Sequence, residues 1–354
     1  MKKTVPFFFI IFILCFVVLT GCSSDKKQAA ENNPVLDTPA EASDADKSSD
    51  ELIADRKFVK ALDAFDRELE ADPGNDKKRL EAAKIARQFD MYDRVEKFVT
   101  PIITRQVGGQ TEAIAWEFLG DSFVARGDLR SAEAIFKRIR ERYKDEPENL
   151  RAMVMHEGHI YWKHAQFAKA LTVFDHLLEL SSKEQIPGVQ LQIALTNRDY
   201  GKSDVFQKKL EEILSKYGYD QAVKHEALVH LADYYIDQGK YDKALNYVSQ
   251  AEKAGADENI TSRIRTDIVH ITTAKEPVEK IEAAYDKLIK RYQDSPTALT
   301  RIYSILGNYY MKHNLYDKAT DAFTKVMELA GDDKQKQWAK NNIDEITRRT
   351  KSKE

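Results

Sequence analysis

Apolar residues recur along most of this chain at the spacing of an α-helix. Between about residues 51 and 350 they are three or four positions apart, with polar or charged residues between them. Phe58, Ala61, Phe65 and Leu69 form one clear example. This spacing places the apolar side chains on one face of a helix and leaves the other face polar. The pattern predicts an all-α protein made of amphipathic helices.

A longer period groups the predicted helices. Starting from a small residue such as Gly120, an aromatic residue follows at +3, a small residue or Asn at +7, an alanine at +12 and an aromatic or β-branched residue at +16. The four segments that share this order are Gly120, Phe123, Gly127, Ala132 and Phe136; Gly158, Tyr161, Ala165, Ala170 and Phe174; Ala232, Tyr235, Gly239, Ala244 and Val248; and Gly307, Tyr310, Asn314, Ala319 and Phe323. Four such matches indicate an internal repeat.

Weaker copies fill the gaps between these four segments. They are anchored at Ala83, Ala194 and Val269, so that the anchors follow one another at a nearly constant interval, at positions 83, 120, 158, 194, 232, 269 and 307. We expect each copy to form two antiparallel helices, whose backbones approach closely at the positions of Gly120 and Ala132. Aromatic residues would fill the space between one pair and the next. The position of Gly127 is predicted to be a turn with positive φ.

The order of these positions resembles the tetratricopeptide repeat, whose pattern is W-x2-L-G-x2-Y…A-x3-F. Trp116, Leu119, Gly120 and Phe123 follow its first part. The resemblance implies a right-handed α-solenoid of about seven antiparallel helix pairs with capping helices. The solenoid is expected over residues 51–332, with a half-repeat at 51–73, repeats starting near 76, 113, 151, 187, 225, 262 and 300, and a capping helix at 333–350.

The spacing of the anchors exceeds the usual length of this repeat, which is about 34 residues. Successive anchors here lie further apart along the chain, as Gly120 and Gly158 do. We therefore expect longer turns between successive repeats, around Pro147, Pro187 and Pro296.

Residues 1–21 are predicted to be a signal peptide. Lys2 and Lys3 precede an apolar stretch over residues 5–20, which would measure about 24 Å as a helix, short of the roughly 30 Å of a bilayer core. Leu19-Thr20-Gly21-Cys22 resembles the bacterial lipobox, and this resemblance implies cleavage after Gly21 and lipid attachment at Cys22. Ser23 in place of Asp implies the outer membrane as destination. An ordinary signal peptide or a short membrane anchor is the alternative.

Charge and cysteine content narrow the possible functions. Residues 22–50 are polar and rich in Pro, Ser and Ala, and we expect them to be a disordered tether. Residues 23–55 hold nine acidic and three basic side chains, so this end of the chain is acidic although the net charge is only −3. That balance predicts no nucleic-acid partner.

Both cysteines precede residue 23, which excludes later disulfides, thiolate metal sites and cysteine nucleophiles.

No residues of the chain form a recognisable catalytic pattern. The sequence lacks a phosphate-binding glycine loop, a zinc-ligand cluster and a nucleophile elbow. His156, His159 and His164 could imitate a metal cluster, but one helix supplies too few ligands. We interpret them as structural or surface histidines. The sequence therefore predicts no enzymatic activity, no cofactor and no metal.

The resemblance also implies a binding groove. In tetratricopeptide proteins the first helix of each repeat lines the concave face, with residues one and four or five positions beyond the anchor pointing into it. The candidate partner-binding residues are Lys84, Arg87, Asp121, His159, Trp162, Lys163, Arg198, Asp233, His270, Asn308, Met311 and Lys312. Trp162 could anchor a peptide, or it could pack on a neighbouring repeat. Asn308 and Lys312 resemble part of a clamp for C-terminal carboxylates, although the other clamp positions do not match.

Lipobox and repeats together resemble periplasmic scaffold lipoproteins of bacterial envelopes, such as the repeat lipoprotein of the β-barrel assembly machinery and the pilot lipoproteins of type IV pilus secretins. This resemblance implies a membrane-anchored periplasmic scaffold for protein–protein interaction in outer-membrane, pilus or secretion assembly. The alternative function is a periplasmic module that binds glycans or small ligands, or that regulates an enzyme.

Overall fold

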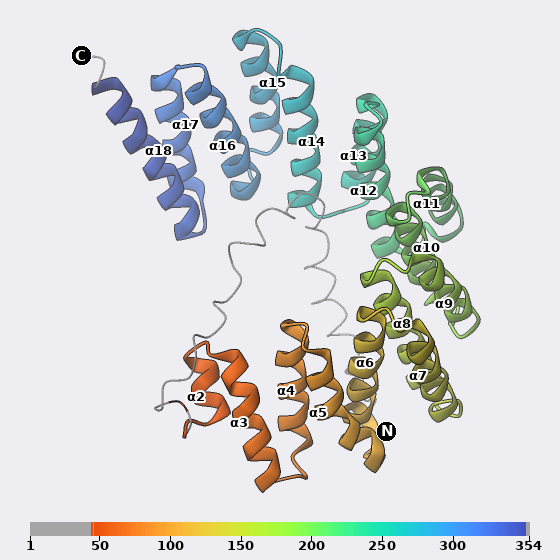
Figure 1. The fold of residues 1–354 in the computed structure, drawn as a ribbon. Helices are drawn as coiled ribbons and strands as arrows, with labels where there is room; N and C mark the ends of the chain where they lie inside the picture. Colours follow the sequence, from red (N-terminus) through yellow and green to blue (C-terminus); the bar gives the residue numbers. More distant parts are fainter. Residues whose placement is uncertain (1–43, 45, 352–354) are drawn as a thin grey trace, which may run out of the picture. The chain divides into compact units, whose positions relative to one another are not determined.

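The computed structural model describes residue 44 and residues 46–351, and within this part the regular structure is entirely helical. The predicted signal peptide, the lipid-attachment position Cys22 and most of the predicted tether lie outside the described residues. The chain divides into two compact units, residues 1–139 and 140–354, which are described separately. Figure 1 shows the helices of both units in chain order.

The described residues form seventeen helices. The first unit contains α2 (Ser49–Ala54), α3 (Phe58–Ala71), α4 (Asp76–Gln88), α5 (Tyr92–Arg105), α6 (Gly109–Ala125) and most of α7 (Leu129–Arg142). The second unit contains α8 (Pro147–Lys163), α9 (Phe167–Glu179), α10 (Ile186–Asp199), α11 (Ser203–Tyr217), α12 (Gln221–Asp237), α13 (Tyr241–Lys253), α14 (Glu258–Thr273), α15 (Val278–Arg291), α16 (Pro296–Lys312), α17 (Tyr316–Leu329) and α18 (Asp333–Lys351).

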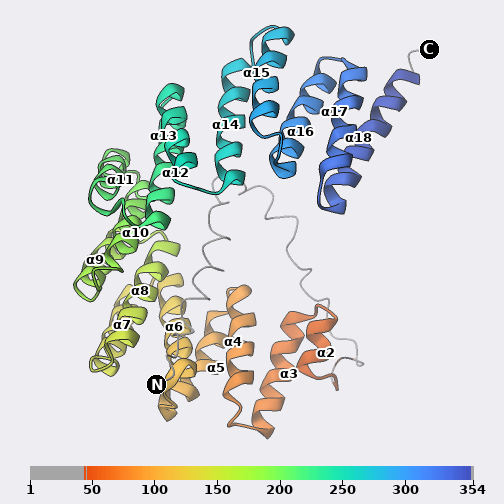
Figure 2. The same ribbon diagram turned by 180° about the vertical axis from the view of Figure 1, so that it is seen from behind.

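Successive helices pack as pairs, from α4 with α5 to α16 with α17. The two helices of a pair are joined by short turns and run antiparallel. First helices also contact the first helices of the next pair, as α4 does with α6, and α12 with α14. Figure 2 shows the same succession from behind. The prediction of an all-α array of seven antiparallel pairs is confirmed.

Glycine at the anchor position allows the two helices of a pair to approach each other closely. A Cβ atom added to Gly120 would lie 2.6 Å from the Phe136 ring, and one added to Gly307 would lie 2.6 Å from the Phe323 ring. Real Cβ atoms do not come this close to other atoms, so the phenyl ring occupies the space that a larger residue would need. The predicted role of the small anchor residue is confirmed.

The turn inside each pair takes a left-handed conformation at the predicted position. The backbone φ is +77° at Gly127, +57° at Ala165 and +58° at Asn314. The pair of α14 and α15 differs, because Pro277 precedes α15 and holds φ at −58°. This difference agrees with the weak match of that segment to the repeat pattern.

The prediction of longer turns around the prolines is wrong for Pro147 and Pro296, whereas the connection before α10 is longer, because α9 ends at Glu179 and α10 begins at Ile186. Pro147 and Pro296 are the first residues of α8 and α16, and Pro187 is the second residue of α10. Proline suits the first turn of a helix, where its missing N–H would have no partner in the helix. The additional residues instead lengthen the first helices, so that α6, α8, α12 and α16 each have 17 residues.

The array begins earlier than the predicted boundary at residue 51. Helix α2 starts at Ser49, where Ser48 and Glu51 cap it reciprocally. The backbone N–H and the hydroxyl of Ser49 donate to the carboxylate of Glu68 in α3, at 2.8 and 2.7 Å. The polar composition of this segment favours a tether over a helix in the sequence. The structure shows a helix, because polar side chains of the segment have hydrogen-bond partners within the protein. The predicted half-repeat is therefore a pair with a short first helix.

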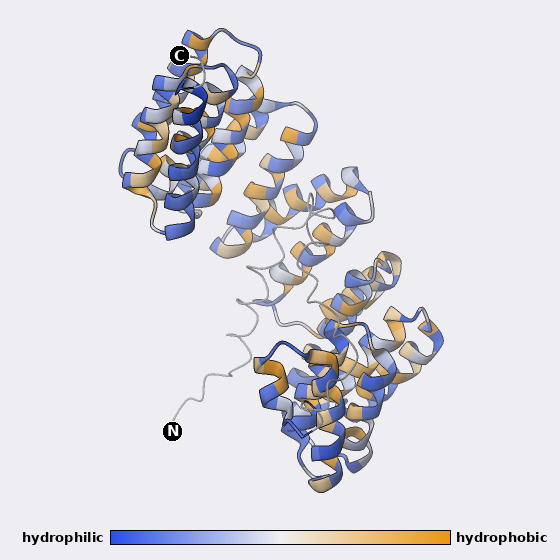
Figure 3. Ribbon diagram, turned by 60° about the vertical axis from the view of Figure 1, so that its left-hand side comes forward, coloured by the Kyte–Doolittle hydropathy of each residue, from blue (hydrophilic) through white to orange (hydrophobic). Residues whose placement is uncertain are grey.

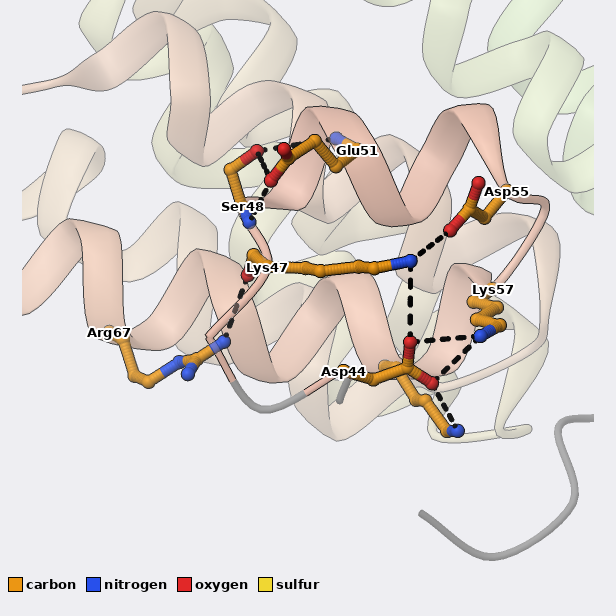
Figure 4. Close-up of polar contacts among 8 residues, drawn as sticks. Asp44, Lys47, Ser48, Glu51, Asp55, Lys57 and Arg67 are labelled. Carbon is orange, nitrogen blue, oxygen red and sulfur yellow. Dashed lines mark hydrogen bonds and ion pairs between the residues drawn. The ribbon is translucent and has the colours of Figure 1, made fainter. Parts of the chain in front are cut away.

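Asp44 fixes the chain just before α2. Its carboxylate accepts hydrogen bonds from Lys57 at 2.8 Å and from Lys60 at 2.9 Å, and it lies 3.6 Å from the ammonium group of Lys47 (Figure 4). The backbone carbonyl of Lys47 also accepts a bond from Arg67 at 3.2 Å. The side chain of Asp44 is buried. The segment before α2 is thus held against α3 by charge-assisted hydrogen bonds.

Helix α18 covers the other end of the array, as predicted. Ala339 and Ile346 are buried, whereas most of its other residues are exposed. Trp338 packs edge-on against Phe323 of α17, with ring centroids 5.4 Å apart. Hydrophobic and hydrophilic residues alternate along the helices throughout the described chain (Figure 3), which is the amphipathic pattern seen in the sequence.

Candidate functional site

Three first helices of the second unit carry a strip of mostly polar residues, which Ala274 and Ile305 interrupt. Positions −6, −2, +1 and +5 from each anchor lie on one helix face, because they are separated by three or four residues. We call this set on α12, α14 and α16 the first-helix strip. Its members are Glu226, His230, Asp233 and Asp237; Arg263, Asp267, His270 and Ala274; and Arg301, Ile305, Asn308 and Lys312.

In the first unit, two of the predicted groove residues pair with each other. Nε of Arg87 in α4 lies 3.2 Å from Oδ2 of Asp121 in α6. The Arg87 guanidinium also lies over the Phe118 ring, 4.9 Å from its centroid. Asp121 is buried, so this pair links two adjacent first helices. Lys84 is exposed one turn earlier on α4.

Trp162 contacts the neighbouring repeat. Its indole Nε1 donates a hydrogen bond of 2.8 Å to Oδ2 of Asp199, at the end of α10. The other carboxylate oxygen of Asp199 is 2.9 Å from Nε of Arg198. The indole is half-buried, while Lys163 beside it is exposed. Of the two alternatives for Trp162, the structure supports contact with a neighbouring repeat, and part of the ring still faces outward.

His159 is a structural histidine, as predicted. Its ring meets the Phe174 ring edge-on, at a centroid distance of 5.5 Å. Burial, with a smaller contribution from the neighbouring His156, lowers the pKa of His159 to about 4. The imidazole is therefore neutral near pH 7. Among the described residues, no three His, Cys, Asp or Glu side chains gather closely enough to hold a metal ion.

Asp233 is a predicted residue whose carboxylate has no bonding partner among the described residues. Its side chain is half-buried on α12 and forms no hydrogen bond or ion pair with any described residue. Burial raises the pKa of its carboxyl, Arg263 opposes this shift, and Asp237 adds to it. The structure thus leaves an anionic group on the first-helix strip that is partly shielded from water and not neutralised by a contacting cation.

The remaining predicted residues lie on α14 and α16. His270 is exposed, with Nδ1 3.4 Å from the hydroxyl of Tyr285. Asn308 and Lys312 are exposed on the same face of α16. Met311 is different, because it packs against the hydrophobic core between α16 and α17. Met311 is half-buried and contributes to packing, and its place in a binding groove stays a prediction.

Five charged or histidine residues of the strip that precede the anchors are not among the residues predicted from the sequence. They are Glu226, His230, Arg263, Asp267 and Arg301. His230 is 9% exposed, and its Nε2 lies 3.6 Å from Oε2 of Glu226. Burial lowers the pKa of His230 to about 4 and raises those of Glu226 and Asp267. Extending the helical spacing two turns back from the predicted residues would have found all five.

The comparisons with known proteins agree with this architecture. Residues 225–254 match the sequence profile described as tetratricopeptide repeat, and this segment covers most of α12 and α13. A comparison with curated proteins finds no match. Within the described part of the chain, no helix is both long and apolar enough to cross a bilayer.

The chain also matches several solved structures. A tetratricopeptide repeat protein from Parabacteroides merdae is 14% identical, with 84% of this chain and 96% of that chain covered, at a TM-score of 0.36. Yeast Tom70 is 14% identical, with coverages of 96% and 78%, at a TM-score of 0.44. PilW, a type IV pilus biogenesis factor, is 16% identical, with coverages of 60% and 94%, at a TM-score of 0.36. These scores support no inference about function.

Proposed function

Because α12 and α13 match the tetratricopeptide repeat and the other pairs share their arrangement, we propose that this protein is an interaction scaffold that binds a segment of a partner protein on its first helices. Repeats of this kind are interaction modules built on stacked helix pairs. The observation that carries the proposal is the first-helix strip, where charged side chains such as Asp233 and Asp237 form no bonds with described residues.

The second helices offer less for recognition. Their apolar residues are buried against the first helices, as Phe174 and Val248 are. Several of their charged side chains form ion pairs within the same helix, such as Lys216 with Glu212 and Lys325 with Glu328. Exposed pairs of this kind contribute little binding energy. A partner segment would find more unbonded polar groups on the first helices.

We further propose that the scaffold works at the bacterial envelope, anchored to the outer membrane by lipid on Cys22 and facing the periplasm, in assembly of outer-membrane proteins, pili or a secretion system. The lipobox-like segment supports this part of the proposal. Residue 44 lies 22 positions after Cys22, so the array can stand at most about 75 Å from the anchor. A Cys22→Ser variant should incorporate no labelled fatty acid, and equal labelling of both proteins would contradict the anchor.

Site-specific photo-crosslinking in intact cells of the native host tests the scaffold. A photoreactive residue replaces His270 or Asn308, which are exposed on first helices. The matched control replaces Asp242, which is exposed in the first turn of the second helix α13. We expect a discrete crosslinked protein from the two strip positions and none from position 242. Equal products from all three positions, or no product from either strip position, would contradict the proposal.

A further inference from the structure

The first helix pair is held together with less apolar contact than the pair that follows it. α2 has six residues, and Leu52 is the apolar side chain that it buries, while Ile53 is partly exposed. α4, the first helix of the next pair, buries four apolar side chains. A helix as short as α2 is not stable by itself in water. Its position on α3 therefore depends on other contacts as well.

Charged groups supply several of these contacts (Figure 4). The carboxylate of Asp44 is bound by Lys57 and Lys60 at the start of α3, and its side chain is only 3% exposed. Nζ of Lys47 lies 2.6 Å from Oδ2 of Asp55, so that the residues on either side of α2 contact each other. We call residue 44 and residues 46–55 the strap. The strap holds five acidic side chains and one basic side chain, and its first residue is bound by two lysines.

The joint between the strap and α3 is strained. Arg56 holds φ at +60°, which is unfavourable for a residue with a Cβ atom. Its amide donates to the carbonyl of Ile53 at 2.9 Å, and the amide of Lys57 donates to the carbonyl of Leu52 at 2.7 Å. When α2 unfolds, these bonds break and Arg56 can return to an ordinary backbone conformation. Relief of this strain offsets part of the cost of opening the strap.

We propose that the strap is detachable and that Asp44 is its latch, so that α2 leaves α3 while α3 to α6 stay folded. Segments with few buried apolar contacts open locally at a lower free energy than the whole protein unfolds. The consequence for reach rests on the proposed anchor at Cys22, whereas the opening itself does not. With the strap open, the array begins at residue 57, and its greatest distance from Cys22 rises from about 75 to about 120 Å.

Hydrogen exchange of the full chain in detergent micelles, resolved by residue, tests this inference. The reporters are the amides of Leu52 and Asp55, whose backbone hydrogen bonds close the turns of α2. Asp44→Asn removes the charge of the latch, and Lys60→Gln weakens the same contact from the side of α3. The control Asp46→Asn removes an exposed carboxylate of the strap. Urea unfolding establishes that each variant keeps a cooperative transition.

In the parent, we expect both reporters to exchange at least about tenfold faster than the slowest amides of α4 and α5. Asp44→Asn and Lys60→Gln should each speed the reporters about tenfold further, with α4 and α5 unchanged and Asp46→Asn without effect. Reporters as slow as α4 and α5 would overturn the strap. Unchanged reporters in either latch variant, or equal acceleration of all helices, would overturn the latch. Equal fatty-acid labelling of parent and Cys22→Ser would remove only the change in reach.

Discussion

At the scale of single residues, size is matched within the helix pairs whose anchor is glycine or alanine, whereas Val269 and its partner Tyr285 do not follow this rule. Where the anchor is Gly120 or Gly307, the residue sixteen positions later is phenylalanine, and its ring lies over the glycine. Where the anchor is Ala232, that later residue is Val248. The larger anchor is thus compensated by a smaller partner, as close packing of protein interiors requires. One contact, rather than each residue alone, is preserved from pair to pair.

Gly120→Ala tests this matching. Forcing a methyl group against the Phe136 ring should cost about 1–3 kcal/mol, which outweighs the roughly 1 kcal/mol that alanine gains over glycine in a helix. Urea unfolding should therefore show a less stable protein. Adding Phe136→Val should restore part of the loss. The control is Gly188→Ala in α10, where an added Cβ has no neighbour within 4 Å, and where we expect a gain of about 0.5–1 kcal/mol. A stabilised Gly120→Ala would contradict the matching.

Ala165 is a second test at this scale, because an alanine holds φ at +57° in the turn after α8. A left-handed backbone destabilises a residue with a Cβ by about 1–2 kcal/mol. Glycine adopts this conformation without that cost, but its greater conformational entropy in the unfolded chain offsets part of the gain in stability. Ala165→Gly should stabilise the protein by about 0.5–1 kcal/mol in the same unfolding assay. Ala168→Gly, in the first turns of α9, should have the opposite sign. Destabilisation by both changes would argue against strain at residue 165.

At the scale of helices, a partly buried ionic network joins α13, α14 and α15. The carboxylate of Glu252 accepts two bonds of 2.8 Å from Arg265, one of 2.5 Å from Arg291 and one of 2.9 Å from the hydroxyl of Tyr292. The network lies beside the pair of α14 and α15, where the repeat pattern is weakest and where Pro277 occupies the turn inside the pair. Specific polar bonds there supplement the apolar contacts that position other pairs.

Comparing the free energy of unfolding of Glu252→Gln and the parent at several pH values should reveal the strength of this network. Burial opposes ionisation of Glu252, but bonds from Arg265 and Arg291 prevail and lower its pKa from 4.5 to about 2. A lowered pKa contributes stability that is present above pH 4.5 and is lost as the pH falls toward 2. The variant should lose up to about 3 kcal/mol at pH 7, and the difference from the parent should shrink below pH 4.5. Glu276→Gln, which alters an exposed pair with Lys280, should change little at any pH. A pH-independent difference would contradict this role for the Glu252 carboxylate.

Helix pairs were predictable from the sequence to the extent that they rest on local spacing. The anchors, the partners at +16 and the turns at +7 all follow from residues in one pair, and the structure confirms them. The start of α2 was not predicted, because Ser49 and Asp44 gain their partners from residues further along the chain, Glu68 for Ser49 and Lys57 and Lys60 for Asp44. Composition alone made them resemble a tether. The capping box formed by Ser48 and Glu51 was the local signal that could have identified this helix.

The candidate site was only partly predictable for a related reason. Helical spacing identified Asp233 and His270, but it cannot show which charges are neutralised by the next repeat. Arg87 is bonded to Asp121, and Trp162 is bonded to Asp199, each across two first helices. Asp233 has no such partner among the described residues. Whether a charge is available for binding therefore depends on contacts between residues that lie one whole repeat apart in the chain, which a single sequence does not reveal.

At the scale of the whole molecule, different parts of the chain have separate tasks. Second helices and anchor contacts hold the pairs together, and the segment from Asp44 to α2 closes the first pair. First helices present the polar strip. Because stability in such arrays comes mainly from contacts between neighbours, changes to the strip should alter binding without unfolding distant pairs. Substitution of Asp233 or Asp237 should consequently alter partner binding without lowering the free energy of unfolding.

Hydrogen exchange of the full chain, with and without the partner recovered by crosslinking, tests the central claim most directly. Partner binding on the first helices should slow amide exchange in α12, α14 and α16 and leave α13, α15 and α17 nearly unchanged. The contrast compares helices of the same pairs, so a general change in stability would affect both sets equally. Slower exchange confined to α13, α15 and α17 would contradict the account.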